Sequence, residues 1–367
     1  MQHEVVGNLH IHTTYSDGTG TPEQIAAAAR GAGLDLLVIN DHNVRVAGHQ
    51  GWHDGLLLLV GQEVHQPEHP HQNHYLVFDA GRDMAPDGKE GPSALLPAVR
   101  QAGGFGAIAH PYERAGRFSG EPVIPWSDWT VADAEAIEIW NYMSEFKSYL
   151  TGPLRTLLYA YAPRLAIRGP YRETLTRWDQ LLAQQKTVAV AGSDAHATLY
   201  QVGPLKRRVF GYDHLFNAVN MHLWLPSRWT RDVERDAEMV HGALAAGCSF
   251  VGYDGLAPTR GFRFWAQGSD TLFYPGDRCT TDRRVKLIIE TPATARIRLM
   301  LNGFCVAQEQ GRRLEHISDA PGVYRVECYR RHALRERGWI FSNLIWIGDD
   351  ARRAGRHEVG QNDPSRR

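Results

Sequence analysis

The 367-residue sequence predicts an α/β fold with a closed or nearly closed barrel, followed by a smaller all-β region. Short, continuous apolar runs alternate with helix signals through about the first 250 residues, which is typical of strands buried on both faces by helices. After Pro258 the pattern changes to short strands of alternating polarity separated by turn residues. An apolar fraction of 43% is enough for a full core.

The first strand–helix unit is the clearest one. Residues 5–12 are predicted to form a strand. Thr21, Pro22 and Gln24 then provide an N-cap, a proline at the first helical position and a capping-box glutamine. The alanine-rich segment that follows is expected to be helical up to Gly31.

Six further apolar runs are predicted strands, which gives a count of about seven and suits a barrel. His74 stands at the start of its run, so that strand is a candidate for the opposite direction. A helix is expected near residues 95–102. The six predicted strands are 34–40, 56–60, 75–78, 106–110, 136–140 and 188–191.

The predicted domain organisation has three parts. Residues 1–258 form the barrel, with an insertion at about 141–185 that caps its mouth. Residues 259–350 form an all-β, sandwich-like domain, and the polar, basic residues 351–367 form a disordered tail. The strands expected in the β domain are 284–290, 295–301, 323–329 and 339–347.

Composition narrows the class of protein. A net charge of −1 gives no sign of a nucleic-acid or membrane partner, and no apolar run approaches the roughly 20 residues that span a bilayer. The N-terminus lacks signal-peptide features, and the four cysteines form no CxxC pair. We therefore expect a cytoplasmic protein with a small-molecule substrate, either monomeric or a homo-oligomer.

Histidine is the compositional anomaly, because 11 of the 18 histidines lie in the first 110 residues. Several of them, together with three carboxylates, follow or border the apolar runs. Catalytic groups of barrels gather at strand C-termini, where the βα loops converge. The nine candidate metal ligands are His10, His12, Asp17, His42, Glu63, His74, His110, Asp194 and His196.

The donor types indicate the metal and the chemistry. His10 and His12 flank one residue, so an extended strand points both imidazoles to the same side. Nitrogen and oxygen donors without thiolates suit Mn²⁺, Zn²⁺ or Fe²⁺ better than Ca²⁺ or Mg²⁺. A carboxylate such as Glu63 can bridge two cations, and such a pair lowers the pKa of a shared water. The set predicts a metal-dependent hydrolase.

In their order along the chain, these motifs resemble the polymerase and histidinol phosphatase (PHP) superfamily of metallohydrolases, over roughly residues 5–255. The resemblance implies a distorted seven-stranded β/α barrel with two or three divalent ions. The 339–343 segment resembles the C-terminal domain of the carbaryl hydrolase-like subgroup. The implied ligand sets are His10, His12, Glu63 and Asp194 for the first metal, Glu63, His74 and His110 for the second, and Asp17, His42 and His196 for the third.

Some assignments leave alternatives open. His65, His69 and His71 compete with His74, which we favour because its spacing from Glu63 matches the family. Asp41 either orients an imidazole or is a polar turn residue.

The capping insertion supplies candidate substrate contacts. Arginine has a planar fork suited to phosphate, although arginines on a capping helix are commonly solvated. The candidates are Arg164, Arg168, Arg172, Asn141 and Tyr142.

The leading hypothesis is a phosphoesterase that hydrolyses a small organic phosphate ester, mono- or diester, by attack of a metal-bridging hydroxide. His196 or Asp194 would protonate the leaving alcohol. One alternative is metal-dependent hydrolysis of a carbamate, ester or amide. Another is a non-catalytic binding or assembly module with a vestigial metal site, which the intact donor set argues against.

Overall fold

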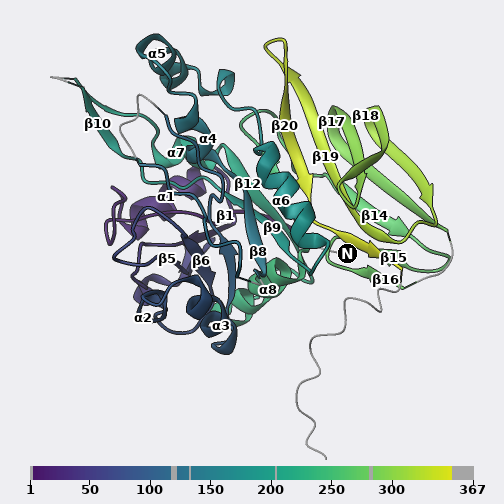
Figure 1. The fold of residues 1–367 in the computed structure, drawn as a ribbon, viewed down its shortest axis with the longest axis horizontal. Coiled ribbons are helices and arrows are strands. Elements are labelled where there is room, and N and C mark those ends of the chain that lie inside the picture. Colours follow the sequence, from purple (N-terminus) through teal and green to yellow (C-terminus); the bar gives the residue numbers. More distant parts are fainter. Residues whose placement is uncertain (1–2, 117–121, 132–133, 203–204, 281–283, 349–367) are drawn as a thin grey trace, which may run out of the picture.

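In the computed structural model of the chain, residues 3–116, 122–131, 134–202, 205–280 and 284–348 are described (Figure 1). The predicted disordered tail, 351–367, lies outside them. The helices are α1 (Pro22–Gly31), α2 (Ala85–Gly88), α3 (Pro92–Gln101), α4 (Tyr142–Ser148), α5 (Pro153–Tyr161), α6 (Arg172–Leu182), α7 (Tyr212–Phe216) and α8 (Val233–Ala246), with 3-10 turns at Ala47–His49 and Pro163–Leu165. No helix of the described residues is long and apolar enough to cross a bilayer.

The strands fall into an N-terminal and a C-terminal group. The first group is β1 (His3–Asn8), β2 (Leu36–Ile39), β3 (Gly51–His53), β4 (Leu56–Val60), β5 (Gln62–Val64), β6 (Tyr75–Phe78), β7 (Phe105–Ile108), β8 (Ala136–Asn141), β9 (Val188–Gly192), β10 (Leu199–Val202), β11 (Leu205–Arg208), β12 (Val219–Leu225) and β13 (Ser249–Tyr253). The second group is β14 (Arg263–Gln267), β15 (Leu272–Phe273), β16 (Arg278–Cys279), β17 (Val285–Leu301), β18 (Phe304–Ser318), β19 (Gly322–His332), β20 (Arg335–Ser342) and β21 (Ile345–Ile347).

Helix α1 forms where its capping signals predict it. The Thr21 hydroxyl accepts a hydrogen bond from the Gln24 amide, and the Gln24 side chain accepts one from the Thr21 amide. Pro22 occupies the first helical position, and Ile25 with two alanines covers the core. The reciprocal cap satisfies two of the amides that a helix start leaves without partners.

All seven predicted barrel strands are present, but hydrogen bonding divides them between two sheets. One sheet continues β12-β1-β2-β4-β3 into the C-terminal strands, and the other has the order β5-β6-β7-β8-β9. The pairing does not show a continuous seven-stranded barrel. Strand β6, which follows His74, is antiparallel to both neighbours, whereas β7, β8 and β9 are parallel.

The two sheets meet at single bridges rather than along paired strands. The chain passes from β4 to β5 at Gly61, where a side chain would lie 2.4 Å from the Val77 carbonyl oxygen. One bridge pairs Ile11 with Ala195, and the other pairs His42 with Glu63. These contacts hold the sheet edges together with only a few backbone hydrogen bonds.

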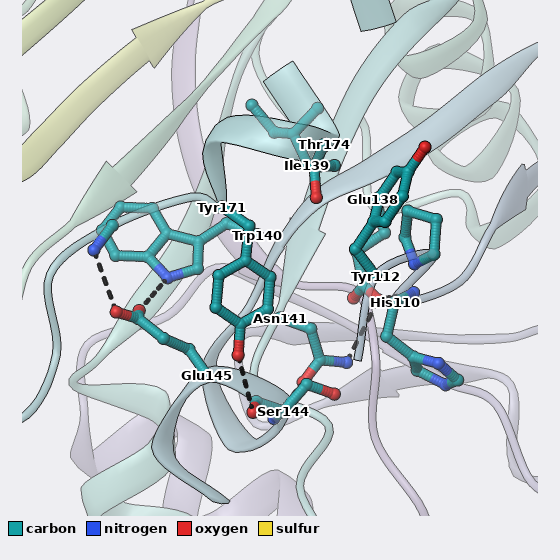
Figure 2. Close-up of a pocket in the computed structure, with 12 residues that line it drawn as sticks. His110, Tyr112, Glu138, Ile139, Trp140, Asn141, Ser144, Glu145, Tyr171 and Thr174 are labelled. Carbon is teal, nitrogen blue, oxygen red and sulfur yellow. Dashed lines mark hydrogen bonds between the residues drawn. The ribbon is translucent and has the colours of Figure 1, made fainter. Parts of the chain in front are cut away.

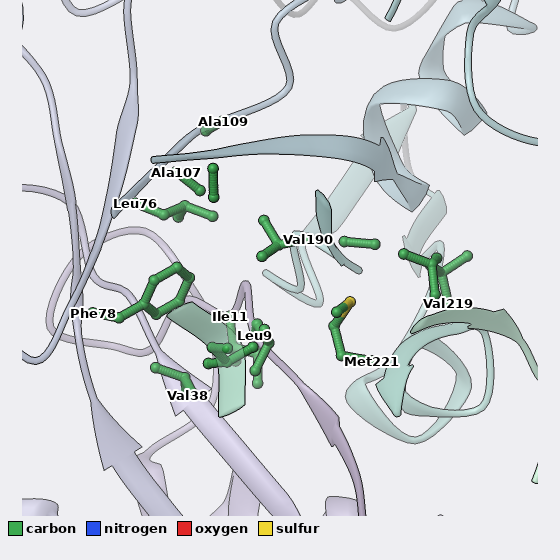
Figure 3. Packing of buried hydrophobic residues seen from close by; sticks show 14 of the residues in the cluster. Leu9, Ile11, Val38, Leu76, Phe78, Ala107, Ala109, Val190, Val219 and Met221 are labelled. Carbon is green, nitrogen blue, oxygen red and sulfur yellow. The ribbon is translucent and has the colours of Figure 1, made fainter. Parts of the chain in front are cut away.

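Side chains from both sheets nevertheless pack into one core. Figure 3 shows Val38 from the first sheet and Leu9, directly after β1, near Phe78 and Val190 from the second sheet. All four are at most 1% exposed. Burial of such side chains contributes roughly 1.5–3 kcal/mol each, so the shared core holds the two sheets together despite the sparse pairing between them.

The C-terminal region is all-β, and all its strands belong to the same hydrogen-bonded sheet as β1 and β12. Strand β20 pairs with β13 at the junction. The two strands predicted at 284–290 and 295–301 are one long strand, β17. The mostly exposed strand β18 was not predicted, because its polar sequence lacks an apolar alternation.

A buried charged cluster joins the first strand to this junction. The imidazole of His222, which is 0% exposed, lies 3.0 Å from Glu4 and 3.3 Å from Asp254. Burial lowers the pKa of His222, but hydrogen bonds with Asp254 and Glu4 outweigh it and raise the pKa above its usual value. Burial raises the carboxyl pKa values, but the contacts with His222 outweigh it, so both pKa values lie below normal.

The cluster gives a pH-dependent contribution to stability. Because the folded-state pKa of His222 is raised, its contribution is complete below about pH 6.5 and is lost as pH rises through the folded-state value. The depressed carboxyl pKa values keep the partners ionised down to about pH 4. We expect His222→Gln to cost roughly 1–3 kcal/mol at pH 5.5 and less at pH 9. Melting temperatures of both proteins at the two pH values test this, with His69→Gln as the exposed control. A deficit that stays constant with pH would contradict it.

Candidate metal centre

The nine candidate ligands converge because they sit where strands end, begin or bridge. His10 and His12 follow β1, His110 follows β7, and Asp194 follows β9. His110 and Asp194 have φ angles of 26° and 55°, a region that non-glycine residues rarely occupy. Such strain concentrates at functional sites, where the surroundings hold it in place.

Glu63 lies at the centre of the cluster and is 1% exposed. Its two oxygens face five imidazoles, three on one side and two on the other. Oε2 lies 3.1 Å from His10 Nε2, 3.1 Å from His12 Nε2 and 3.3 Å from His42 Nδ1, and Oε1 lies 2.8 Å from His74 Nδ1 and 3.0 Å from His110 Nε2. A carboxylate shared in this way is suited to bridging two cations.

The other two carboxylates extend the cluster toward solvent. Asp194 Oδ1 lies 3.5 Å from His10, 3.4 Å from His12 and 3.3 Å from His196. The Asp17 side chain is 57% exposed and lies 3.1 Å from His196 Nε2. The buried side of the cluster is therefore centred on Glu63 and its exposed side on Asp17.

Four overlapping groups of these side chains could each hold a metal ion, with ligand atoms within 4.8 Å of one another. The set implied for the third metal, Asp17, His42 and His196, is found with His12 added. The set implied for the second metal differs, because His42 rather than His110 accompanies Glu63 and His74. The groups are His12, Asp17, His42 and His196; His10, His110 and Asp194; His10, His12 and Glu63; and His42, Glu63 and His74.

The electrostatics of the cluster favour added positive charge. Burial raises the pKa of Glu63, but its imidazole neighbours outweigh burial and hold the pKa well below its usual value. Burial likewise lowers the pKa values of His12 and His110, yet contacts with Glu63 and Asp194 raise each to about 9. Burial and the neighbouring His12 lower the pKa of His42 to about 3. The buried carboxylates therefore attract positive charge, which protons or metal cations can supply.

The imidazoles are oriented by partners on their far sides. His74 donates from Nε2 to the Pro70 carbonyl at 3.0 Å, and His110 donates from Nδ1 to the Ile124 carbonyl at 3.1 Å. This leaves Nδ1 of His74 and Nε2 of His110 facing Glu63. Hydrogen bonds of this kind fix the tautomer and ring orientation of metal-binding histidines.

Glu138 is a buried orienting residue that the sequence analysis did not identify. Its Oε1 accepts from His10 Nδ1 at 3.0 Å, and its Oε2 accepts from the His110 amide at 2.8 Å. Asn141 donates to the same Oε2 at 3.1 Å, as Figure 2 shows. The available signal was an acidic residue inside the otherwise apolar run of β8.

The geometry distinguishes the alternatives for the histidine near Glu63 and for Asp41. Among the four competing histidines, His74 contacts Glu63, whereas His65 stacks on His74 at 4.6 Å. Asp41 accepts hydrogen bonds from Thr13 and Ser16 and so stabilises the loop after His12. This supports the turn interpretation of Asp41.

A cavity of about 680 Å³ opens onto the cluster and is lined by metal-site side chains and by apolar ones. The apolar lining includes Met143, Phe210 and Leu215, and Lys147 also lines the cavity. Lys147 forms an ion pair of 2.9 Å with buried Glu113. Neither Lys147 nor Met143 was singled out from the sequence, because nothing local marks them as cavity residues.

The structure places none of the five predicted substrate contacts in the described lining of this cavity. Arg164 lines a neighbouring cavity, Arg168 lies over the Tyr149 ring, and Arg172 begins α6. Tyr142 hydrogen-bonds His214, and Asn141 contacts Glu138. The insertion residues in the described lining are instead Met143 and Lys147, and the five substrate contacts stay predictions.

Comparisons with known proteins give distant similarities. No protein-family profile matches the chain. A curated relative, uncharacterized protein MJ1587 of Methanocaldococcus jannaschii, is 22% identical over 149 residues, covering 36% of this chain and 80% of that protein.

Three solved structures are also similar. One is a two-domain protein from Bacteroides vulgatus containing a predicted PHP-like metal-dependent phosphoesterase (14% identity, 94% of this chain and 95% of that chain, TM-score 0.41). Another, from Bifidobacterium adolescentis, is described as a candidate metal-dependent phosphoesterase (18%, 55% and 91%, TM-score 0.33). The third is an amidohydrolase from Chromobacterium violaceum with bound sulfate and no metal (16%, 52% and 87%, TM-score 0.30). At these values the function has to be inferred from the site itself.

We expect Glu138→Ala to weaken Mn²⁺ binding by roughly 10- to 100-fold, because His10 loses the partner that fixes its orientation. Titration calorimetry on the metal-depleted protein measures this directly. Asp236→Asn is the matched control, because Asp236 is a buried carboxylate in the first turn of α8 that accepts from the Thr230 and Arg231 amides rather than contacting the cluster. Equal affinities for both variants would show that Glu138 does not orient a ligand.

Proposed function

We propose that this chain is a metal-dependent hydrolase that cleaves small organic phosphate esters at the Glu63 cluster. The observation that carries the proposal is the carboxylate of Glu63, shared by five imidazoles at the base of an open cavity. The motif resemblance to the PHP superfamily, including its carbaryl hydrolase-like subgroup, supports the same class of chemistry.

The cluster's unpaired nitrogens fit bound cations. Both ring nitrogens of His12 and Nδ1 of His42 are buried without a hydrogen-bond partner. These atoms lie within 4 Å of Glu63 or Asp17 without forming a hydrogen bond, and metal coordination would use them. Imidazole and carboxylate donors without thiolate suit two or three Mn²⁺, Zn²⁺ or Fe²⁺ ions. The nine clustered residues would hold them, with Asp17 serving the solvent-exposed position.

When bound, divalent cations would supply Lewis acidity and lower the pKa of a water at the site. The side chains then position and protonate the substrate. His196 lines the cavity and donates from Nδ1 to the Asp194 carbonyl at 3.0 Å. Its Nε2, which faces Asp17 at 3.1 Å, can pass a proton to the leaving alcohol when the ring is protonated and this nitrogen holds no cation. The apolar wall formed by Met143, Phe210 and Leu215 limits access of bulk water.

A second candidate is hydrolysis of a carbamate, ester or amide at the same cluster. The charge of the cavity favours this candidate. Of the described lining residues only Lys147 is a lysine or arginine, and it already forms an ion pair with Glu113. A neutral carbonyl substrate needs no additional cation, whereas a phosphate ester would rely on the metal ions for charge neutralisation. We propose a small-molecule substrate in either case.

The decisive experiment compares initial rates on an aryl phosphomonoester, an aryl phosphodiester and an aryl carbamate. We expect phosphate-ester turnover that is lost on chelation and restored by Mn²⁺ or Zn²⁺. Glu63→Gln and Asp194→Ala should each lower turnover on the order of 100-fold or more, because both remove shared ligand oxygens.

Purified wild-type protein treated with chelator and Asp236→Asn serve as controls for contamination and for altered packing. Activity that survives chelation would rule out the proposed mechanism. Turnover of the carbamate alone would select the carbonyl substrate instead.

A further inference from the structure

A buried arginine of the C-terminal β region binds the backbone of the capping insertion. Arg337 of β20 is 2% exposed. It donates to the Ile167 carbonyl at 2.6 Å and to the Leu165 carbonyl at 2.8 Å. The adjacent Gly338 amide donates to the Arg168 carbonyl at 2.7 Å. One strand of the β region therefore fixes several consecutive peptide groups of the insertion.

The same segment of the insertion is bound on its other side by Glu145 of α4. The Glu145 carboxylate accepts from the amides of Arg168 and Gly169 at 2.6 and 3.1 Å, and from the Trp140 indole at 2.8 Å. Figure 2 shows Glu145 between the indole and the insertion backbone. Since Glu145 is 2% exposed, these hydrogen bonds are shielded from water.

Helix α4 forms part of the catalytic cavity. Met143 and Lys147 both line it. Asn141 caps the helix by accepting from the Ser144 amide at 2.9 Å, and its side-chain amide donates to Glu138. A continuous series of hydrogen bonds thus runs from β20 through the insertion to the cavity wall.

A second contact holds the far end of the insertion. Arg325 of β19 is 2% exposed and donates to both carboxylate oxygens of Asp179 on α6, at 3.0 and 2.9 Å. It also donates to Glu327 at 2.6 Å. Such a buried bidentate pair has a defined geometry and is costly to break.

We propose that the C-terminal β region positions the wall of the catalytic cavity and that Arg337 is a positioning residue for substrate binding. This rests on the proposed hydrolase function. Arg337 touches neither the cluster nor the described cavity lining, so its effect reaches the substrate through Glu145 and α4. Its loss should therefore disturb substrate binding and leave the metal ligands in place.

The test uses the full-length, metal-loaded protein carrying Arg337→Met. We expect KM for the best aryl ester to rise about 10-fold, with kcat and the Mn²⁺ dissociation constant within about twofold of wild type. Arg337→Lys, which keeps the charge and one or two of the hydrogen bonds, should recover part of the loss. Arg313→Met removes an arginine that contacts Glu290 and Glu315 within the β region rather than the insertion, and is the control.

Hydrogen exchange separates this proposal from the function itself. In Arg337→Met we expect faster exchange at the amides of Arg168, Gly169 and α4, with unchanged protection of the His12 amide, which is bonded to Ala195. Gly338→Ala provides a second variant, because its added carbon would lie 3.1 Å from Gly169 Cα.

The outcomes are distinct. An unchanged KM, an unchanged exchange pattern, or equal losses in KM, kcat and metal affinity would overturn the positioning role. If wild-type protein cleaves no ester, the hydrolase function fails, while the exchange pattern still decides whether Arg337 holds the cavity wall.

Discussion

The buried negative charge of Glu63 and Asp194 is the constraint on which the rest of the site depends. Two carboxylates at 1% and 7% exposure could not remain ionised there without positive charge close by. The imidazoles around them can accept protons or share metal ions, and their far sides are tied to backbone carbonyls and to Glu138. These partners fix the orientation of the donor rings, which reduces the reorganisation that cation binding would require.

The same residues join the two sheets. In one bridge, Ile11 lies between His10 and His12 in the sequence, and its partner Ala195 lies between Asp194 and His196. The other bridge pairs His42 with Glu63, which are both candidate ligands. Cations held at the cluster would add bonds where backbone pairing is sparse. Metal binding and the closure of the fold are thus physically linked, as they are in other proteins whose ligands come from separate segments.

Prediction from sequence succeeded where the signal was local and failed where it was not. Apolar runs located the strands, and Thr21 with Gln24 located the start of α1, because both patterns act within a few residues. The separation into two sheets depends on which strand edges meet, and no local pattern encodes that choice. Glu138 was missed because a single acidic residue in an apolar strand does not indicate which side chains it contacts. The arginines of the insertion, such as Arg168, were assigned by residue type, whereas in the structure the Arg168 side chain lies over Tyr149 and its carbonyl accepts from the Gly338 amide of β20.

The C-terminal strands belong to the same structural unit as the strands that position the Glu63 cluster. A separate binding module would be expected to meet the barrel through an exposed, weakly paired linker. Here β20 extends the sheet that contains β1, and His222 connects that first strand to the loop after β13. Arg337 and Arg325 both direct buried guanidinium donors at the insertion, although Nε of Arg337 has no hydrogen-bond partner. Since the insertion also supplies Met143 and Lys147 to the cavity, the β region is joined to the cavity lining by residues nearly two hundred positions away in the sequence.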